Sequence, residues 1–311
     1  MDVGRVASVA GIVSDEVSKS FGSVPVLRRV SFEAPAGQAT LLAGRNGAGK
    51  TTWIRVALGL AGADSGRVHF GRGRSVDQVR GGVAIVPDEP SVYPALNGHA
   101  NLRLLSGIRT ADPQNLDRIR EMLGLDDAFL AMRASGYSLG QRRRLAIAAA
   151  LLREPRYLFC DEPTIGLDPV AWVAVREALR DLLDRGAAVL ITGQDFTALE
   201  SLCDQVALLR DGAIAFEGDV ETFLSRRASR VRVVVPDAAA LASRLDRQRM
   251  VRDRETVDIP CTDAEDARAL MEWIRSSDVV FSSLSVERDS LEEAFLAIHS
   301  EREGASDATV C

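Results

Sequence analysis

A glycine-rich segment after residue 43 has the residue types and the spacing of a phosphate-binding loop. In ATLLAGRNGAGKTTW, the residues Gly44, Gly49, Lys50 and Thr51 follow the pattern G-x-x-x-x-G-K-[ST]. Glycines allow successive backbone N–H groups to converge on an anion, and the start of the following helix favours negative charge. Lys50 would then contact the β and γ phosphates of a nucleotide, and Thr51 would offer its hydroxyl to Mg²⁺. A chance glycine turn is the alternative, and the predicted strand–loop–helix order argues against it.

Two acidic residues follow another apolar stretch, in RYLFCDEPTIGLDP. The run from Tyr157 to Cys160 predicts a strand that is buried on both faces of a parallel sheet. Asp161 and Glu162 come at its carboxyl end, where open α/β sheets bind ligands. Asp161 suits coordination of Mg²⁺, and Glu162 suits polarising a water molecule aimed at a γ phosphate. The alternative is an acidic loop that caps the helix predicted to begin near Pro169.

A third segment, GYSLGQRRRLAIAAALLREP, predicts a helix whose start can bind an anion. Ser138 can cap this helix and Gly140 lies in its first turn. Leu145, Ile147 and Leu151 would form its buried face. A second anion-binding helix start is more than one nucleotide needs.

These three segments, in this order and spacing, resemble the nucleotide-binding subunit of ABC transporters over roughly residues 12–227. The resemblance implies that two such domains bind Mg·ATP as a head-to-tail dimer and hydrolyse it. Each nucleotide would lie between the phosphate loop of one domain and the signature helix of the other. Ser138, Gly140 and Gln141 would therefore contact the nucleotide held by a second copy of this chain or by a homologue, which accounts for the second helix start.

The resemblance also implies roles for single residues. Those expected in catalysis are Glu162, Lys50 and Gln194. Those expected to bind Mg²⁺ are Thr51, Asp88 and Asp161. Those expected to bind ATP are Phe21, Gly44, Asn46, Gly47, Gly49, Lys50, Thr51, Thr52, Ser138, Gly140, Gln141 and Asp168.

Two of these positions have a plain structural alternative. Phe21, in KSFGSVPVL, falls where the family stacks an aromatic ring on adenine, and any aromatic face can stack a base. The alternative is an ordinary core phenylalanine. Asp168, in GLDP, falls in the loop that crosses the dimer interface in the family, and the alternative is a solvated turn aspartate.

Three residues depart from the commonest family pattern. Leu139 replaces a glycine in the signature, which reads YSLGQ. Asp88, in AIVPDEPSVYPAL, replaces the loop glutamine that contacts Mg²⁺ and reports to the membrane partner; aspartate can accept a hydrogen bond but cannot donate one. Glu89 could take this role instead, or the segment could be a plain acidic turn. Gln194, in the TGQDF that follows the strand predicted at residues 187–191, replaces the switch histidine, and its amide can donate to a phosphate oxygen but carries no positive charge.

The elements that must position these residues predict an α/β P-loop NTPase fold of the ABC ATPase type. Residues 1–228 form the nucleotide-binding domain, with a helical subdomain at about residues 90–155. Within it, helices are expected near residues 97–108 and 113–123. The resemblance implies that this subdomain faces the membrane subunit, with Tyr93 and Leu96 in SVYPALNGHANL as the expected docking contacts.

After residue 228 the pattern changes to shorter alternating strands and helices, which predicts a small α/β domain over residues 229–300 and a flexible tail over residues 301–311. This part has no glycine loop or carboxylate pair. It resembles the accessory domain on ATPase subunits of drug and antibiotic exporters of the daunorubicin-resistance type, which implies a dimerisation or regulatory module.

Composition limits the partners and the compartment. The net charge of −6 argues against bulk attraction to nucleic acid or to an anionic membrane surface. No apolar run approaches the roughly 18 residues of a membrane span, and the first residues, MDVGRVASVAG, lack a signal pattern. Four scattered cysteines fit reduced thiols. We therefore expect a cytosolic protein, and the resemblance implies that it lies at the cytoplasmic face of the cell membrane, attached through a separate transmembrane permease.

Three functions fit these observations. The first is an ATPase subunit that drives a permease, with export of a drug, antibiotic or other hydrophobic compound favoured by the C-terminal resemblance. The second, motivated by Asp88 and Gln194, is a weakly hydrolysing regulatory subunit paired with a more active ATPase. The third is a soluble ABC protein of translation or DNA repair, a class that usually carries tandem cassettes, long coiled coils or zinc-type cysteine pairs, none of which this sequence shows.

Overall fold

The computed structural model describes residues 11–108, 112–225, 230–238, 241, 250–251, 255–261, 264–287, 289–296 and 298. The chain forms two compact units that divide between Asp219 and Val220, whereas the first domain predicted from the sequence runs to residue 228. The predicted tail, residues 301–311, and nearly all of the segment ALASRLDR, residues 240–247, lie outside the described residues.

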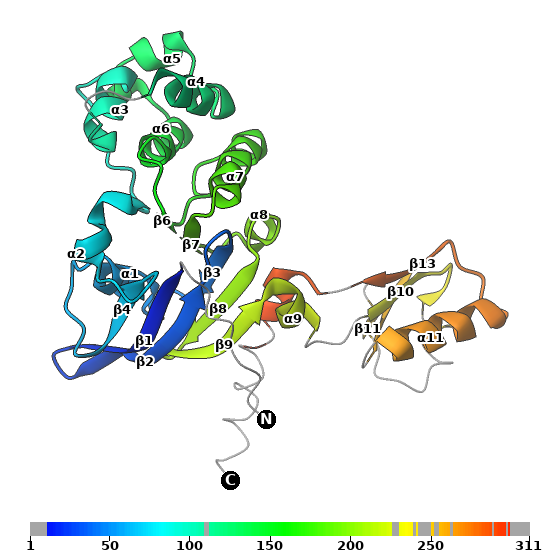
Figure 1. Ribbon diagram of the computed structural model, residues 1–311. Helices are drawn as coiled ribbons and strands as arrows, with labels where there is room; N and C mark the ends of the chain where they lie inside the picture. The colour runs from blue at the N-terminus through cyan, green and yellow to red at the C-terminus, as the bar shows by residue number, and fades with distance from the viewer. Residues whose placement is uncertain are drawn as a thin grey trace. The chain divides into compact units, whose positions relative to one another are not determined.

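The first unit is built on a six-stranded sheet (Figure 1). In sheet order its strands are β5 (Val83–Val86), β6 (Tyr157–Asp161), β7 (Ala188–Thr192), β3 (Ala39–Ala43), β8 (Gln205–Arg210) and β9 (Ala213–Asp219). All neighbouring pairs are parallel except β8 and β9. Every residue of β6, β7 and β3 is buried, as expected for apolar strands inside a parallel sheet. Because parallel strands end at the same edge, the residues that follow β5, β6, β7 and β3 meet there.

A second, antiparallel sheet shares a core with the first one. Its strands, in sheet order, are β2 (Val24–Ala34), β1 (Ile12–Phe21) and β4 (Ser65–Phe70). The helix α1 (Lys50–Ala57) buries Trp53 in this core, with its ring 4.7 Å from that of Phe32 and 6.4 Å from that of Phe159. The indole N–H of Trp53 donates to Ser14 Oγ at 2.9 Å. The first turn of α1, which carries the phosphate loop, is therefore held between two sheets.

The remaining helices of the first unit mostly lie to one side of the large sheet (Figure 1). They are α2 (Val76–Val79), α3 (Gly98–Ser106), α4 (Pro113–Met122), α5 (Asp127–Ala131), α6 (Leu139–Leu151), α7 (Pro169–Asp184) and α8 (Phe196–Glu200), with short 3₁₀ turns at Arg80–Gly82 and Ala134–Gly136. Helices α3 and α4, which match the two helices predicted from the sequence, both pack against α6. The side chain of Asn97 accepts a hydrogen bond from the backbone N–H of Ala100 at 2.9 Å and so starts α3.

Within its described residues, the second unit contains a four-stranded antiparallel sheet, the helices α9 (Val220–Ser225) and α11 (Ala264–Ser276), and a helical segment at residues 291–296. In sheet order the strands are β11 (Met250–Val251), β12 (Thr256–Pro260), β10 (Arg230–Val234) and β13 (Ser283–Glu287). Val231 and Val233 join residues of α11 in an apolar core. Arg232, which alternates with them along β10, donates to both carboxylate oxygens of Asp258, at 2.8 and 2.9 Å. The period of two along the strand thus separates an apolar face from a charged face.

Candidate nucleotide site

The phosphate loop has the backbone that its glycines permit. Gly47 and Gly49 have φ angles of 81° and 109°, and α1 begins immediately after Gly49 with no side chain capping its first N–H groups. A β carbon on Gly49 would lie 2.8 Å from a methyl group of Leu27, and one on Gly44 would lie 2.5 Å from the carbonyl oxygen of Leu209. The free N–H groups at this helix start are therefore available to an anion, and side chains are excluded from the loop.

Lys50 is buried beside this loop. Its ammonium donates to the carbonyl oxygens of Gly44 at 2.7 Å and of Arg45 at 3.2 Å. Burial lowers the pKa of Lys50, and the carboxylates of Glu162 and Asp161 act in the opposite direction. The ammonium is thus placed at the loop by main-chain contacts alone, where a phosphate would be a stronger partner.

The two predicted carboxylates are buried at the end of β6. Asp161 Oδ1 accepts a hydrogen bond from Thr192 Oγ1, and the backbone N–H of Glu162 donates to that same hydroxyl at 3.2 Å and to the Thr192 carbonyl at 3.1 Å. Glu162 has a left-handed φ of 52°, a strained conformation that concentrates at functional sites. The alternative interpretation of this pair as a helix cap is wrong, because Asp168 caps α7 by accepting from the Ala171 N–H at 2.8 Å.

Gln194 joins the phosphate loop to the second carboxylate. Its amide Nε2 donates to Asn46 Oδ1 at 3.0 Å and lies 3.4 Å from Glu162 Oε1. Gln194 follows β7, Asn46 follows β3 and Glu162 follows β6, so three segments that are far apart in the sequence meet at the Gln194 amide. In the sequence, this contact is indicated only by the polar residues Gln194 and Asp195, which follow the apolar β7 strand.

The pKa of Glu162 is raised above its usual range. Burial is the main cause, and the negative charges of Asp161 and Asp88 add to it. The hydrogen bond from Gln194 and the charge of Lys50 lower it. A carboxylate with a raised pKa is a stronger base once ionised, which suits proton transfer from water.

These residues line one cavity of about 400 Å³. Its lining contains Asn46, Gly47, Gly49, Lys50, Thr51, Thr52, Asp88, Asp161, Glu162 and Gln194, all of which are predicted site residues, together with Val26 and Ile165. Sequence analysis missed these two apolar residues and also Thr192. The hydroxyl of Thr51 and the carboxylates of Asp161 and Asp88 are oxygen ligands of the kind that Mg²⁺ takes, so the donor set fits this ion.

The other predicted residues do not line this cavity. Phe21 is 53% exposed, so its interpretation as a core residue is wrong, and the ammonium of Lys19 lies 5.6 Å from its ring centre. Gly44 contacts the ammonium of Lys50 through its carbonyl oxygen. At the start of α6, Ser138 Oγ accepts from the Gln141 N–H at 3.2 Å, while Gln141 Oε1 accepts from the Ser138 N–H at 2.8 Å.

The signature turn is packed against the loop before α7. A β carbon on Gly140 would clash with the carbonyl oxygen of Gly166, and a β carbon on Gly166 would lie 2.6 Å from the side chain of Leu139. Asp168, which ends this loop, is exposed at the start of α7. The glycine at position 140 is therefore required by local packing.

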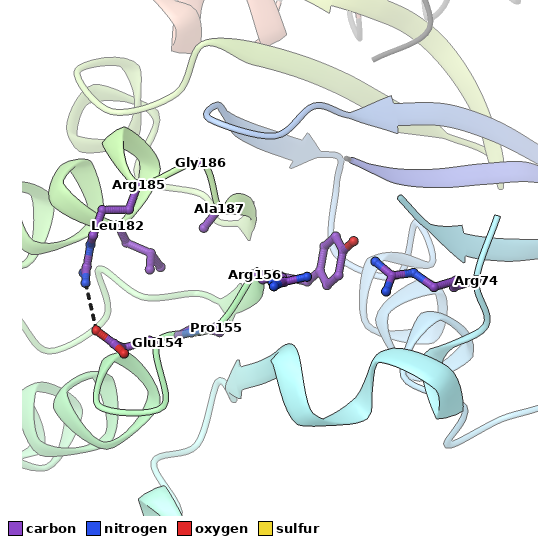
Figure 2. Close-up of a pocket in the computed structure, with 9 residues that line it drawn as sticks. Arg74, Glu154, Pro155, Arg156, Leu182, Arg185, Gly186 and Ala187 are labelled. Carbon is purple, nitrogen blue, oxygen red and sulfur yellow. Dashed lines mark hydrogen bonds and ion pairs between the residues drawn. The ribbon is translucent and has the colours of Figure 1, made fainter. Parts of the chain in front are cut away.

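Two further cavities lie in the first unit. One, of about 270 Å³, is a groove between β5 and the helices, lined by Val83, Ala84, Ile85, Pro87, Ser91, Leu105, Ala146, Ala149, Ala150 and Arg153. The other, of about 450 Å³, lies at the amino ends of β6 and β7 and is lined by Arg74, Glu154, Pro155, Arg156, Tyr157, Leu182, Arg185, Gly186 and Ala187 (Figure 2). Neither contains a predicted site residue.

Among the residues described, no helix has the length and apolar content needed to cross a membrane.

Residues 27–165 match the family model described as ABC transporter. The "Uncharacterized ABC transporter ATP-binding protein YdbJ" of Bacillus subtilis (strain 168) is 30% identical over 90% of this chain and 92% of its own length.

Relatives whose names give a cargo differ in that cargo. The "Fe(3+) ions import ATP-binding protein FbpC" of Pseudomonas fluorescens is 32% identical over 74% of this chain and 68% of its own length. The "Bacitracin transport ATP-binding protein BcrA" of Enterococcus faecalis is 29% identical over 76% of this chain and 78% of its own length. With the phosphate loop and the carboxylates of β6 in one cavity, these similarities show that the chain belongs to the ATP-binding subunits of ABC transporters, which are ATPases coupled to transport.

Proposed function

We propose that this chain binds Mg·ATP in the 400 Å³ cavity and hydrolyses it as a head-to-tail dimer to drive a separate transmembrane permease. The observation that carries the proposal is the position of Glu162. Its buried carboxylate shares the cavity with Lys50 and is hydrogen-bonded through Gln194 to the phosphate loop. A base held in this way faces the end of a nucleotide whose phosphates lie along the loop.

Each residue has a distinct task in this mechanism. The N–H groups at the start of α1 and the ammonium of Lys50 bind the β and γ phosphates. Thr51, Asp161 and Asp88 would hold Mg²⁺, which when bound neutralises phosphate charge. Glu162 orients the attacking water and accepts its proton, while the amide of Gln194 keeps Glu162 Oε1 beside Asn46.

A second ATP-binding subunit, identical or homologous, would complete the site. Ser138, Gly140 and Gln141 lie outside the cavity of their own chain, at a helix start whose N–H groups can bind an anion. Four apolar side chains near this helix start and the loop before α7 are more than 40% exposed, which supports contact with another subunit; they are Leu139, Ile165, Val170 and Val173.

The groove beside β5 is our candidate for the contact with the permease. β5 is an edge strand, and the groove places the exposed side chain of Ile85 beside Leu105 and the small residues of α6. Of the docking segment proposed from the sequence, Ser91 lines the groove and Tyr93 is 50% exposed. A permease segment in this groove would hold the subunit at the cytoplasmic face of the membrane.

Export of a drug, antibiotic or other hydrophobic compound is the direction we favour. The direction is supported by the C-terminal resemblance to exporters of the daunorubicin-resistance type. An antibiotic cargo is supported by the relative named for bacitracin transport. Because another relative is named for iron import, the direction of transport needs an experimental test. Uptake of a labelled antibiotic into inverted vesicles would indicate export, whereas uptake into right-side-out vesicles would indicate import.

The first experiment measures Mg·ATP turnover of the chain co-purified with its permease, beside Glu162→Gln and Gln194→His. Turnover that is abolished by Glu162→Gln, with ATP-bound dimers accumulating, supports a working motor. A Glu162→Gln variant that stays monomeric in saturating Mg·ATP would contradict the dimer mechanism.

A second candidate is a weakly hydrolysing regulatory subunit, which is favoured by Asp88 and Gln194 at the positions of the family's glutamine and histidine. It predicts negligible turnover of the wild-type chain and a gain in the Gln194→His variant. Measurable wild-type turnover that depends on Glu162 would exclude it.

A further inference from the structure

Arg143 is a fully buried cation that the proposed mechanism does not use. It projects from the second turn of α6, and its side chain has no exposed surface. Its Nη1 donates to the carbonyl oxygen of Pro87 at 2.6 Å, and its Nη2 donates to the carbonyl oxygen of Asp88 and lies 3.8 Å from Asp88 Oδ1. The guanidinium therefore binds two consecutive residues of the loop after β5.

These two residues belong to different cavities. Pro87 lines the groove beside β5, and Asp88 lines the nucleotide cavity. The two cavities thus meet at a single peptide unit, and that unit is bound from α6, the helix that begins at the Ser138 cap. A displacement of this loop from the groove side would move Asp88 in the nucleotide cavity.

The charge of Arg143 makes this contact hard to break. Burial lowers the pKa of Arg143, while Asp88 and, more weakly, Cys160, Asp161 and Glu162 stabilise its charged form. Its Nε has no hydrogen-bond partner, so the two loop carbonyls are its principal acceptors. A buried guanidinium that lost them would be left without compensation, which is strongly unfavourable. The loop and α6 are therefore expected to move together.

We infer that Arg143 is the positioning residue that couples the groove beside β5 to the nucleotide cavity, by binding the Pro87–Asp88 segment to the signature helix. This inference rests on the proposed function, because it takes the permease as the occupant of the groove. Through Arg143, one displacement of the loop changes the place of Asp88 in its own chain's cavity and the place of Ser138 at the start of α6.

The test compares Arg143→Gln with Arg144→Gln, a matched change one residue along the same helix. Arg144 also donates to a backbone carbonyl, that of Leu123 at 3.2 Å, and lies 5.7 Å from the ring of Phe129, but it contacts the helical region instead of the loop. Thermal unfolding of both variants reports the loss of a buried hydrogen bond. The decisive quantity is the ratio of ATP turnover in the permease complex to turnover of the chain alone.

We expect Arg143→Gln to lower this ratio at least about fivefold, the lower end of typical coupling between sites, and Arg144→Gln to leave it unchanged. Hydrogen exchange at residues 86–89 of the chain alone should rise only in Arg143→Gln. Arg143→Lys, which retains charge with a single donor group, should give an intermediate ratio and serves if the glutamine variant does not fold.

The outcomes separate this inference from the proposed function. A folded Arg143→Gln or Arg143→Lys variant that keeps the full wild-type ratio would overturn the inference, because a merely structural arginine lowers stability without lowering the ratio. A wild-type chain whose turnover the permease does not stimulate would overturn the proposed function, and the inference with it.

Discussion

Two cavities of similar volume, about 400 and 450 Å³, lie at opposite ends of the same parallel strands. Each contains a glutamate with a left-handed backbone, Glu162 with φ 52° in the nucleotide cavity and Glu154 with φ 47° in the arginine-lined cavity. Glu162 is buried and hydrogen-bonded to an amide, whereas the Glu154 side chain is 61% exposed and pairs with Arg185 at 3.3 Å (Figure 2). Backbone strain and a nearby cation are therefore common to both cavities.

The cavities differ in what their backbone offers. The nucleotide cavity lies at the carboxyl ends of the strands, beside uncapped N–H groups at the start of α1 and two buried carboxylates. The arginine-lined cavity lies at the amino ends and presents three guanidiniums, of which Arg185 also pairs with Asp181 at 2.7 Å. Positive side chains alone do not make a nucleotide site, because they lack both the converging N–H groups and the oxygen ligands for Mg²⁺.

The largest effect is expected from the two glutamates. Glu162→Gln should lower ATP turnover by about 10²–10⁴-fold, the range for loss of a positioned base, while Mg·ATP binding persists. Glu154→Gln, its match in the other cavity, should leave turnover unchanged. Steady-state phosphate release from both variants measures this. A strongly reduced turnover of Glu154→Gln would show that the two cavities are not functionally distinct.

Removal of a cation should also affect the two cavities differently, in this case through ATP affinity. Lys50→Ala removes a charge-assisted contact to phosphate, worth about 1.5–3 kcal/mol, so ATP affinity should fall about 10- to 150-fold. Arg185→Ala removes a cation that pairs with Glu154 and Asp181 and should not change ATP affinity. Titration with a fluorescent ATP analogue compares the two, and equal losses would mean that net charge, rather than loop geometry, binds the nucleotide.

The residues of the phosphate loop could be predicted because their relation is local. Gly44, Lys50 and Thr51 lie within eight positions of one another, and the strand and helix on either side determine where they point. The Ser138 cap was predictable for the same reason, since its acceptor and donor are three residues apart. Buried apolar runs likewise indicated β6 and β7 and placed Asp161 and Gln194 at one edge.

Contacts between distant segments could not be predicted from motif spacing. Gln194 meets Asn46 across 148 positions, and Arg143 meets Pro87 across 56. Both contacts depend on the strand order β5-β6-β7-β3, which no local pattern states. Thr192 and Ile165 could not be predicted for the same reason. The role of a threonine at the end of a strand, or of an isoleucine in a loop, is visible only when the neighbouring segments are in place.

A smaller effect is expected from the amide that supports Glu162. Gln194→Ala should lower turnover about two- to tenfold, in line with about 0.5–1.5 kcal/mol for a neutral hydrogen bond. Because this hydrogen bond lowers the pKa of Glu162, its loss should raise that pKa further. The base must be ionised, so activity is present above this pKa and lost below it, and the acid limb of the turnover–pH profile should move to higher pH.

The neighbouring Asp195→Asn is the control for this shift. Asp195 caps α8 by accepting from the Ala198 N–H at 3.1 Å, and asparagine caps as well. Its profile should coincide with that of the wild type. An acid limb that does not move in Gln194→Ala would mean that the Gln194 amide does not stabilise ionised Glu162 in the working enzyme.

The last comparison separates backbone strain from ligand binding. Gly186, in the arginine-lined cavity, follows α7 with φ 84°, donates to the Leu183 carbonyl at 2.7 Å, and has no atom within 4 Å of an added β carbon. Gly186→Ala should therefore cost only the left-handed conformation, about 1–2 kcal/mol, with ATP affinity unchanged. Gly49→Ala carries the same backbone cost and also a contact of 2.8 Å with Leu27, so it should lose stability and ATP affinity together. Urea unfolding and ATP titration on both variants decide this, and loss of ATP affinity in Gly186→Ala would show that the two cavities communicate through the strands between them.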